Sequence, residues 1–228
     1  MYKNFLKRLL DLILSLFAII LLIIPMIIIA VMIKIDSKGP VIFVQERVGK
    51  HKKNFKILKF RTMKVETSPD VPTHEMQDSE KWITKVGRFL RKTSIDEIPQ
   101  IFNIFIGHMS IVGPRPALWN QYDLIEERDK YGANDIRPGL TGLAQINGRD
   151  ELEISVKAKF DGKYVEELNK GKFKGVAIDC KCFWGTIFSV LRKEGVKEGR
   201  ASDINNEETQ DQKEVIEEVA ISEMEKDK

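Results

Sequence analysis

An acidic pair, Asp96-Glu97, and a nearby arginine, Arg115, are the residues of this chain whose types and spacing best suit chemistry. The pair lies in T-S-I-D-E-I-P-Q, and the arginine lies in the proline-flanked loop G-P-R-P. An aspartate with an ordinary pKa of about 3.9 is ionised at neutral pH, and an ionised aspartate can attack a phosphoryl group. A guanidinium binds phosphate oxygens through paired hydrogen bonds. The pattern therefore predicts phosphate chemistry, with Asp96 as nucleophile and Arg115 offsetting negative charge.

The acidic pair also has a purely structural interpretation. Ser94 and Glu97 have the spacing of a capping box, which begins a helix. Alternatively, Asp96 is itself the cap, and Pro99 then falls in the first turn, where its missing N–H costs nothing. Because a capping box explains Ser94 and Glu97 but not Asp96, both interpretations stay open at this point.

Further groups could complete a phosphate site around the pair. Arg91 and Lys92 directly precede it and could add positive charge. A hard divalent ion, Mg²⁺ above all, could bind through carboxylate oxygens of Asp96. These additions would offset the repulsion between a carboxylate nucleophile and a diphosphate.

A second segment of interest is glycine-rich. Residues 137–149 read R-P-G-L-T-G-L-A-Q-I-N-G-R and combine three glycines with two arginines and amide side chains. Glycine lets backbone approach a ligand closely, so we expect ligand contact here, with Gln145 and Arg149 as candidate substrate-binding residues. The alternative is a glycine-rich structural turn.

These groups must be positioned near a membrane, because residues 12–33 form an uncharged apolar run with Pro25 near its centre. A span needs about 20 apolar residues, whereas a secretory signal would be shorter and followed by small residues for cleavage. Basic residues flank the run on both sides, and such residues favour the cytoplasmic side. Charge and proline together fit two arrangements, a single crossing and a kinked helix that returns to the same side.

The charge of the chain is distributed unevenly. The net charge of +3 conceals a tail, residues 203–228, with ten acidic residues and three lysines. The remaining basic body suits an anionic membrane face or a phosphorylated ligand. No nucleic-acid recognition motif accompanies it, so we expect no nucleic-acid partner. Cys180 and Cys182 lack a second pair that would complete a zinc site.

Several elements follow from local patterns. Residues 41–48 and 55–63 are rich in β-branched and aromatic residues and predict a hairpin. Residues 98–106 and 118–130 predict helices, the first ending at Gly107. Residues 66–78 predict a loop. Two basic amphipathic stretches, at residues 82–92 and 183–193, predict helices that rest in the headgroup layer or pack on the core.

Four ordered segments together resemble a known family. They are F-K-I-L-K-F-R-T-M, R-K-T-S-I-D-E-I-P-Q, M-S-I-V-G-P-R-P and the glycine-rich segment, within a match from about residue 5 to 195. They resemble the monotopic phosphoglycosyl transferases, the bacterial sugar transferase family of capsule, lipopolysaccharide and glycoprotein pathways. The resemblance implies Mg²⁺-dependent transfer of a phospho-sugar from a UDP-sugar to undecaprenyl phosphate. The transfer would proceed through a covalent aspartyl intermediate and release UMP. The reaction would initiate glycan assembly.

The resemblance also implies roles for individual residues. Asp96 matches the family nucleophile, and Glu97 matches its dyad partner. Arg115 matches an arginine linked to nucleotide binding, while Lys59 and Arg91 match basic residues near that site. The segment P-A-L-W-N-Q-Y, residues 116–122, resembles capsule-type members thought to use 2-acetamido sugars.

The fold implied by the resemblance is of the α+β class. It has a mainly helical cytosolic domain with a small β-hairpin, an N-terminal re-entrant membrane helix and interfacial amphipathic helices. We expect the membrane helix at residues 1–36, the catalytic domain at 37–202 and a disordered acidic tail at 203–228. The chain looks like the short form of the family, attached to inner-membrane lipids of a bacterium with its catalytic domain in the cytoplasm. One departure is Ile24, where the family often has serine before the proline, which leaves the kink angle open.

Two other functions compete with this one. A non-catalytic membrane anchor or adaptor could use the basic face alone, but it would need none of Asp96, Glu97 and Arg115. A glycosyltransferase that moves a sugar without its phosphate would release UDP instead of UMP.

Overall fold

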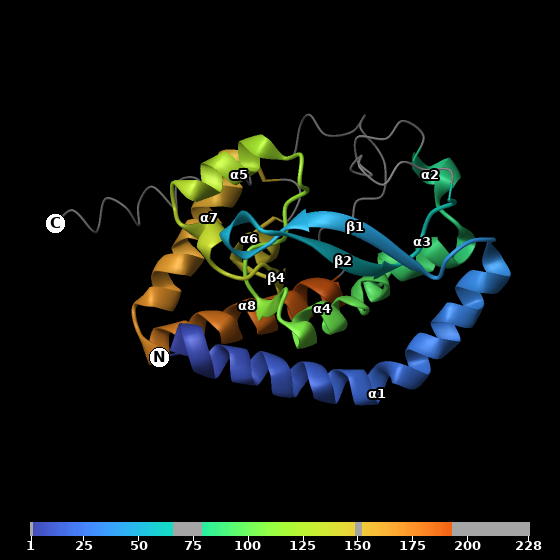
Figure 1. Cartoon of the computed structure of the whole chain (residues 1–228), viewed down its shortest axis with the longest axis horizontal. Helices are drawn as coiled ribbons and strands as arrows, with labels where there is room; N and C mark the ends of the chain where they lie inside the picture. Colours follow the sequence, from blue (N-terminus) through green and yellow to red (C-terminus); the bar gives the residue numbers. More distant parts are fainter. Residues whose placement is uncertain (1, 66–78, 149–151, 193–228) are drawn as a thin grey trace. The chain divides into compact units, whose positions relative to one another are not determined.

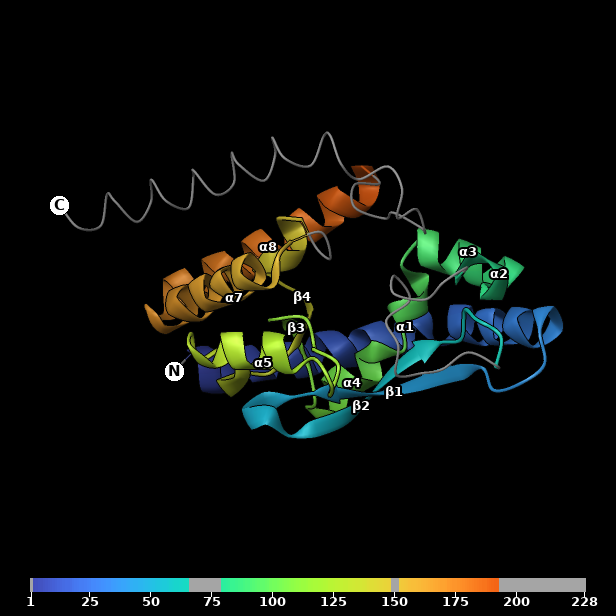
Figure 2. The same cartoon turned by 90° about the horizontal axis from the view of Figure 1, so that it is seen from above.

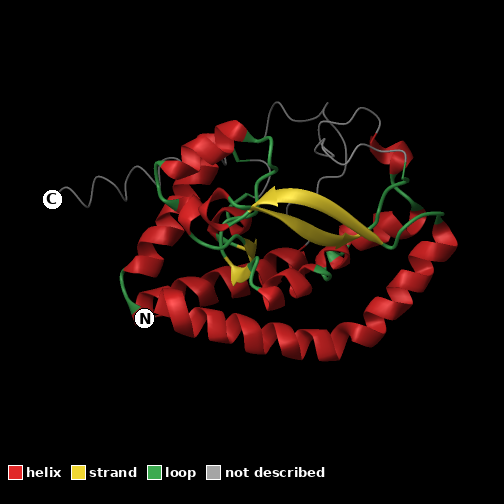
Figure 3. Cartoon of the chain, in the orientation of Figure 1, coloured by secondary structure: helices red, strands yellow, loops and turns green. Residues whose placement is uncertain are grey.

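The computed structural model describes residues 2–65, 79–148 and 152–192, and within these ranges the chain is mainly helical with two small sheets (Figures 1 and 3). This confirms the α+β prediction at the level of a helical domain with a hairpin. The predicted loop at 66–78 and the acidic tail at 203–228 lie outside the described residues. The predicted division at residues 36 and 202 remains a prediction.

The apolar run forms one long helix. After a π-helical turn, Tyr2–Leu6, helix α1 extends over Lys7–Asp36, contains Pro25 and is visibly bent (Figure 1). Most of its large apolar side chains are exposed, while Met26 and Ile33 are buried against the body. Among the described residues it is the one helix long and apolar enough to cross a membrane.

Both ends of α1 are fixed to the body. At the N-terminal end, the Asp11 carboxylate accepts hydrogen bonds from Ser110 Oγ at 2.8 Å and from the Ile111 N–H at 2.9 Å. At the C-terminal end, Asp36 accepts from the Val86 N–H at 2.9 Å. A single compact body therefore holds both ends of a 30-residue helix.

The predicted hairpin is confirmed. Strand β1 (Ile42–Val48) pairs antiparallel with β2 (Asn54–Phe60), with Ile42 opposite Phe60. The connecting turn contains a 3-10 segment, Lys50–Lys52, in which His51 and Lys52 adopt positive φ. The hairpin carries Lys59 toward the acidic pair.

Two predicted helices begin later or break because β-bridges interrupt them. The stretch at 82–92 divides into α2 (Ser79–Trp82) and α3 (Lys85–Lys92), since Ile83 forms a bridge with Met63. The side chain of Thr84 then caps α3 by accepting from the Gly87 N–H at 3.0 Å. Likewise Leu118 forms a bridge with Arg47, so α5 (Tyr122–Asp129) starts four residues later than the pattern predicts.

The remaining elements surround the site. Helix α4 (Gln100–Ile106) ends at Gly107, as predicted, with a φ of 94° that suits glycine. Strands β3 (Ser110–Val112) and β4 (Gly139–Thr141) pair in parallel, and α6 (Leu143–Ile146) follows. Helices α7 (Ile154–Asn169) and α8 (Lys172–Arg192) lie side by side (Figure 2). A buried apolar cluster joins α1, β2, α3 and α4.

Candidate active site

The acidic pair lies in a tight turn ahead of α4. Ile95–Glu97 form a 3-10 helix, and Ser94 before it adopts a left-handed conformation with a φ of 55°. The Ser94 side chain makes no capping hydrogen bond, and α4 begins only at Gln100. The capping-box interpretation is therefore wrong, because the Ser94 side chain caps neither the 3-10 helix that follows it nor α4.

Glu97 binds two cations from other parts of the fold. Its Oε1 atom accepts from Lys59 Nζ at 2.7 Å and from an Arg115 Nη at 2.9 Å. The side chains of Glu97 and Lys59 are 18% and 17% exposed, whereas that of Arg115 is 39% exposed. One carboxylate thus joins the hairpin, the turn and the proline-flanked loop, and Arg115 keeps access to solvent.

The two carboxylates have different electrostatic environments. Burial acts to raise the pKa of Glu97, but the charges and hydrogen bonds of Arg115 and Lys59 outweigh it and lower that pKa below its ordinary 4.5. Burial raises the pKa of Asp96 above its ordinary 3.8, the neighbouring Glu97 adds to the rise, and nearby cations oppose it. Glu97 is therefore fixed as an anion, and Asp96 is the more basic and more nucleophilic carboxylate of the two.

Arg91 completes the positive surroundings from α3. Its Nε donates to the Oγ1 atom of buried Thr62 at 2.8 Å, and its charge acts on Asp96. Helix α3 reaches this position because Gly87 lies against the backbone of Thr62, where a Cβ would collide with the Thr62 carbonyl oxygen. The structure thus gathers four predicted residues, Lys59, Arg91, Glu97 and Arg115, around Asp96.

The glycine-rich segment holds the loop of Arg115 in place. The Gly113 N–H donates to the Thr141 carbonyl at 2.8 Å, and the Gly139 N–H donates to the Pro114 carbonyl at 2.8 Å. A Cβ on Gly139 would collide with the backbone nitrogen of Gly113. Gly139 and Gly142 therefore allow close contact with the backbone of Gly113.

Three charged residues that the sequence analysis missed also position this loop. Arg128 donates to the Arg115 carbonyl at 2.9 Å and is bound in turn by Asp161 at 2.6 Å, in an ion pair that is almost fully buried. Arg47 donates to the Pro116 carbonyl at 3.0 Å. The sequence could have indicated that Asp161 is buried, because it lies at helical spacing from the apolar residues Ala158, Val165 and Leu168. All of these residues are buried in α7.

Two predicted substrate-binding residues are not placed at the cluster. Gln145 is buried in α6, and its Nε2 donates to the Leu140 carbonyl at 3.2 Å within its own segment. No hydrogen bond or ion pair joins it to Glu97 in the part of the chain that the structure describes. Arg149 lies outside the described residues, and both roles remain predictions.

The donor set fits a magnesium ion shared with a substrate. In the described ranges no three histidine, cysteine or acidic residues gather into a self-sufficient metal site. The Oε1 atom of Glu97 is already bound by two cations, which leaves Asp96 as the available carboxylate. Mg²⁺ is commonly held by one or two carboxylates together with substrate phosphates and waters, so this arrangement suits it only when a diphosphate is present.

Comparison with known proteins identifies the class of this fold and site. Residues 2–193 match the family described as Bacterial sugar transferase. Because this match covers most of the chain, the protein belongs to the bacterial sugar transferase family. The family resemblance seen in the sequence is thereby confirmed.

Curated relatives place the chain more closely. It is 40% identical, over 82% of its length, to UDP-glucose:undecaprenyl-phosphate glucose-1-phosphate transferase of Escherichia coli (strain K12), of which it covers 40%. It is 36% identical, over 72% of its length, to UDP-N-acetylgalactosamine-undecaprenyl-phosphate N-acetylgalactosaminephosphotransferase of Aeromonas hydrophila, again covering 40%. It is 34% identical to Exopolysaccharide production protein PSS of Rhizobium leguminosarum bv. phaseoli, over 82% of this chain and 96% of that protein. The chain thus spans about two fifths of some relatives and nearly all of another.

Proposed function

We propose that this protein is a phosphoglycosyl transferase that moves a sugar-1-phosphate from a UDP-sugar to undecaprenyl phosphate and releases UMP. The observation that carries the proposal is the arrangement of Asp96 beside a Glu97 that is already bound by Lys59 and Arg115. The names of the relatives, which specify UDP-sugars and undecaprenyl phosphate, support the same reaction.

In the first step, a carboxylate oxygen of Asp96 attacks the phosphorus atom that carries the sugar. A bond forms between that oxygen and phosphorus, and the bond from phosphorus to the bridging oxygen of the diphosphate breaks. The bridging oxygen leaves with its electron pair as part of UMP. Arg115, whose side chain is 39% exposed, would bind the phosphate oxygens on which charge accumulates.

In the second step, a phosphate oxygen of undecaprenyl phosphate attacks the same phosphorus atom. The bond between phosphorus and Asp96 breaks, which restores the carboxylate and yields undecaprenyl-diphosphate-sugar. Glu97 is a poor proton donor because its pKa is lowered. Its role in this account is to hold Lys59 and Arg115 in place through both steps.

We propose Mg²⁺ as the cofactor, with one Asp96 oxygen and substrate phosphates as its ligands. Bound there, the ion would neutralise diphosphate charge and act as a Lewis acid. Asp96 has two carboxylate oxygens, so one would be available to hold the ion and the other to act as nucleophile. Glu97, which binds Lys59 and Arg115, would keep these two side chains in position.

We also propose that α1 enters the cytoplasmic face of a bacterial inner membrane and returns to it. The support is geometric, because Asp11 near one end and Asp36 at the other are both hydrogen-bonded to the same body. A straight 30-residue helix would be about 45 Å long and would separate its ends across a membrane. The interfacial role of α3 and α8 belongs to the same proposal, with exposed Phe89, Trp184 and Phe188 facing lipid.

Single cysteines introduced at Lys3 and at Lys38 test this topology. In intact cells, an impermeant thiol reagent should label neither position, because both would be cytoplasmic. Labelling at position 3 would exclude the re-entrant arrangement. Replacing Pro25 with leucine should straighten α1, expose position 3 to the reagent and reduce activity although Asp96 is unchanged.

The reaction itself is tested by incubating purified protein with undecaprenyl phosphate, Mg²⁺ and a panel of UDP-sugars. Release of UMP supports the proposal, release of UDP indicates direct glycosyl transfer, and no release with any sugar favours the anchor or adaptor. We propose a 2-acetamido sugar as substrate from the segment at residues 116–122. Relatives of similar identity are named for glucose and for N-acetylgalactosamine, so identity alone does not select the sugar.

A further inference from the structure

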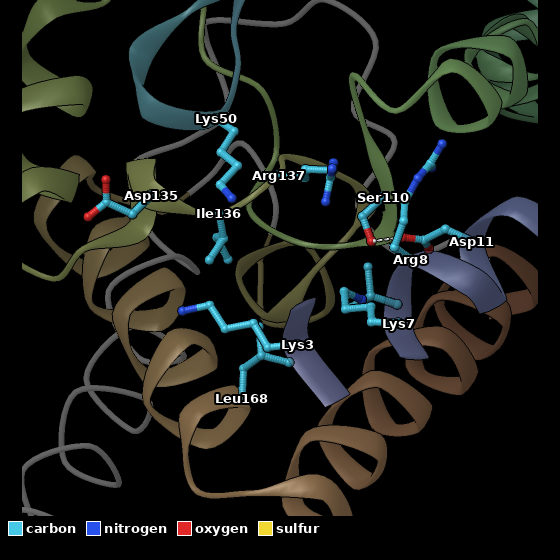
Figure 4. A pocket seen from close by; sticks show the side chains of 11 residues that line it. Lys3, Lys7, Arg8, Asp11, Lys50, Ser110, Asp135, Ile136, Arg137 and Leu168 are labelled. Carbon is cyan, nitrogen blue, oxygen red and sulfur yellow. Dashed lines mark hydrogen bonds between the residues drawn. The ribbon is translucent and has the colours of Figure 1, made fainter. Parts of the chain in front are cut away.

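A cavity of about 160 Å³ lies at the N-terminal end of α1, away from the acidic pair (Figure 4). Its lining comes from the start of the chain, the hairpin turn, β3, the segment before β4 and α7. The lining is strongly basic and includes Lys3, Lys7, Arg8, Lys50 and Arg137. None of the residues gathered around Asp96 lines it.

Two of these cations are anchored by neutral groups. Arg8 donates to the carbonyl oxygens of Ile104 and Phe105 at 2.6 and 2.7 Å, and Arg137 Nε donates to that of Gly107 at 2.9 Å. All three carbonyls belong to the C-terminal end of α4, which attracts cations. Carbonyl oxygens hold the guanidiniums in place without cancelling their full charges, so two like charges remain close together.

The other cations differ in how far they are neutralised. Lys7 is paired with Asp179 at 2.7 Å, so its charge is largely compensated. Lys3 donates to the neutral amide oxygen of Asn169 at 2.9 Å. Lys50 extends toward the cavity from the hairpin turn, and no hydrogen bond or ion pair to its ammonium group is present among the described residues (Figure 4). The terminal nitrogens of Arg137 are equally without a partner there.

The two carboxylates in the lining do not pair with these cations within the described ranges. Asp11 accepts from Ser110 Oγ and the Ile111 N–H, as the dashed line in Figure 4 marks for the serine. Asp135 binds His51 at 3.1 Å, and its side chain is 69% exposed. Among the described residues, the cavity therefore keeps an excess of positive charge that no ion pair balances.

We propose that this cavity is a second anion site that binds one phosphate group. Its volume is below the roughly 300 Å³ at which sites for larger ligands begin, so a phosphate fits and a UDP-sugar does not. Helix α4, seven residues or about 10 Å long, separates it from the acidic pair. The phosphate bound here is thus not the one that Asp96 attacks.

The phosphate could belong to a lipid headgroup or be free in solution. A headgroup is favoured because α1, which supplies Lys7 and Arg8, exposes Leu9, Leu12 and Ile13 in the adjoining turns. A phosphodiester in the cavity could then extend its acyl chains along these side chains.

The test uses the full-length protein in neutral detergent, with thermal unfolding followed against ligand concentration. The three probes are dihexanoyl phosphatidylglycerol, dihexanoyl phosphatidylcholine and inorganic phosphate. A ligand of the folded state raises the melting temperature in a concentration-dependent way. Phosphatidylglycerol should do so, and Lys50→Gln should weaken its apparent affinity about fivefold, the effect of one lysine near an anionic surface. Lys50 is exposed, so this variant should fold normally.

Lys52→Gln is the matched control, because Lys52 lies in the same turn but binds Asp129 outside the cavity. It should leave the affinity within about twofold, as should Asp96→Asn. Binding of phosphatidylglycerol alone identifies a lipid site, and equal binding of inorganic phosphate identifies a free-phosphate site. The proposal is overturned if neither anion binds, if phosphatidylcholine binds as well as phosphatidylglycerol, or if Lys50→Gln has no more effect than Lys52→Gln. None of these outcomes depends on turnover at Asp96.

Discussion

The two ends of α4 hold clusters of cations in opposite ways. Before its first residue, Lys59 and Arg115 are bound by the carboxylate of Glu97. At its C-terminal end, Arg8 and Arg137 are bound by backbone carbonyls. Within the part of the chain that the structure describes, the first arrangement contains its own anion and the second does not.

This difference indicates what each end can do with a phosphate. At the acidic end, Glu97 offsets part of the positive charge and fixes the geometry of the cations, which suits phosphate groups that must arrive and leave in every turnover. At the basic end, no carboxylate of the described residues forms an ion pair with Arg8 or Arg137, which suits an anion that stays bound. Variants at each end test whether the two ends bind phosphate independently of one another.

The largest expected effect is at the acidic end. Asp96→Asn should lower the rate of UMP release by more than about a thousandfold, or roughly 4 kcal/mol of barrier, because an amide is not an anionic nucleophile. Folding and phosphatidylglycerol binding at the basic end should be unchanged. A rate within about tenfold of wild type would exclude the nucleophilic role.

Glu97→Gln should have the next largest effect. It removes the carboxylate that binds both Lys59 and Arg115, and removing one partner of a buried pair commonly costs about 3–5 kcal/mol. Because Arg115 is 39% exposed, we expect a loss of about 2 kcal/mol in unfolding free energy and a rate about a hundredfold lower. Chemical denaturation and UMP release measure the two effects. Lost stability with nearly normal turnover would show that the cations need no carboxylate to stay in place.

Gly139→Ala should affect both ends of α4, because its segment contacts Pro114 on one side and carries Arg137 toward Gly107 on the other. The added Cβ would collide with the Gly113 backbone. We expect a loss of about 2–3 kcal/mol, as for overpacking elsewhere, with weaker phosphatidylglycerol binding and slower turnover together. Normal lipid binding in a variant with impaired turnover would contradict the shared role of this segment.

The pH dependence of activity should separate the two carboxylates. Burial and Glu97 raise the pKa of Asp96 above 3.8, so activity should fall, as pH decreases, at a higher pH than for an ordinary aspartate. Glu97→Gln removes one contribution to that rise and frees two cations, so this limb of kcat/KM should move to lower pH. The stability that Glu97 contributes should be fully present above pH 4.5 and be lost as pH falls through its lowered pKa. If the acidic limb of kcat/KM does not move in Glu97→Gln, a group other than Asp96 controls that limb.

The smallest effect concerns the left-handed residues that bracket α4, Ser94 with φ 55° and Gly107 with φ 94°. Gly107 adopts this conformation without strain, whereas Ser94 stores about 1 kcal/mol. Ser94→Gly should therefore raise the unfolding free energy by up to about 1 kcal/mol, measured by chemical denaturation. A loss of stability instead would show that the Ser94 side chain supports the turn.

The sequence was sufficient for the elements whose residues interact locally. The hairpin, α4 with Gly107 and the apolar helix follow from periodicity and turn residues, and the pairing of Asp96 and Glu97 with Arg115 followed from motif order. Tertiary contacts decided the rest. The bridge of Leu118 to Arg47 delays α5, and the backbone hydrogen bonds of Gly113 and Gly139 give the glycine-rich segment a supporting role that its sequence did not predict. The basic cavity could not be foreseen, because its cations are brought together only by the fold.

The proposed attack by Asp96 is tested most directly by incubating the protein with Mg²⁺ and a UDP-sugar labelled at the sugar-bearing phosphate, without lipid acceptor. The covalent mechanism predicts one equivalent of UMP and one covalently attached phospho-sugar, which mass spectrometry should locate at Asp96. The phospho-sugar should be discharged when undecaprenyl phosphate is added, and it should be absent in Asp96→Asn. Lys50→Gln should form the same adduct. If turnover with lipid proceeds without any adduct and the kinetics are sequential, the covalent intermediate is excluded. Direct attack by the lipid phosphate would then be indicated.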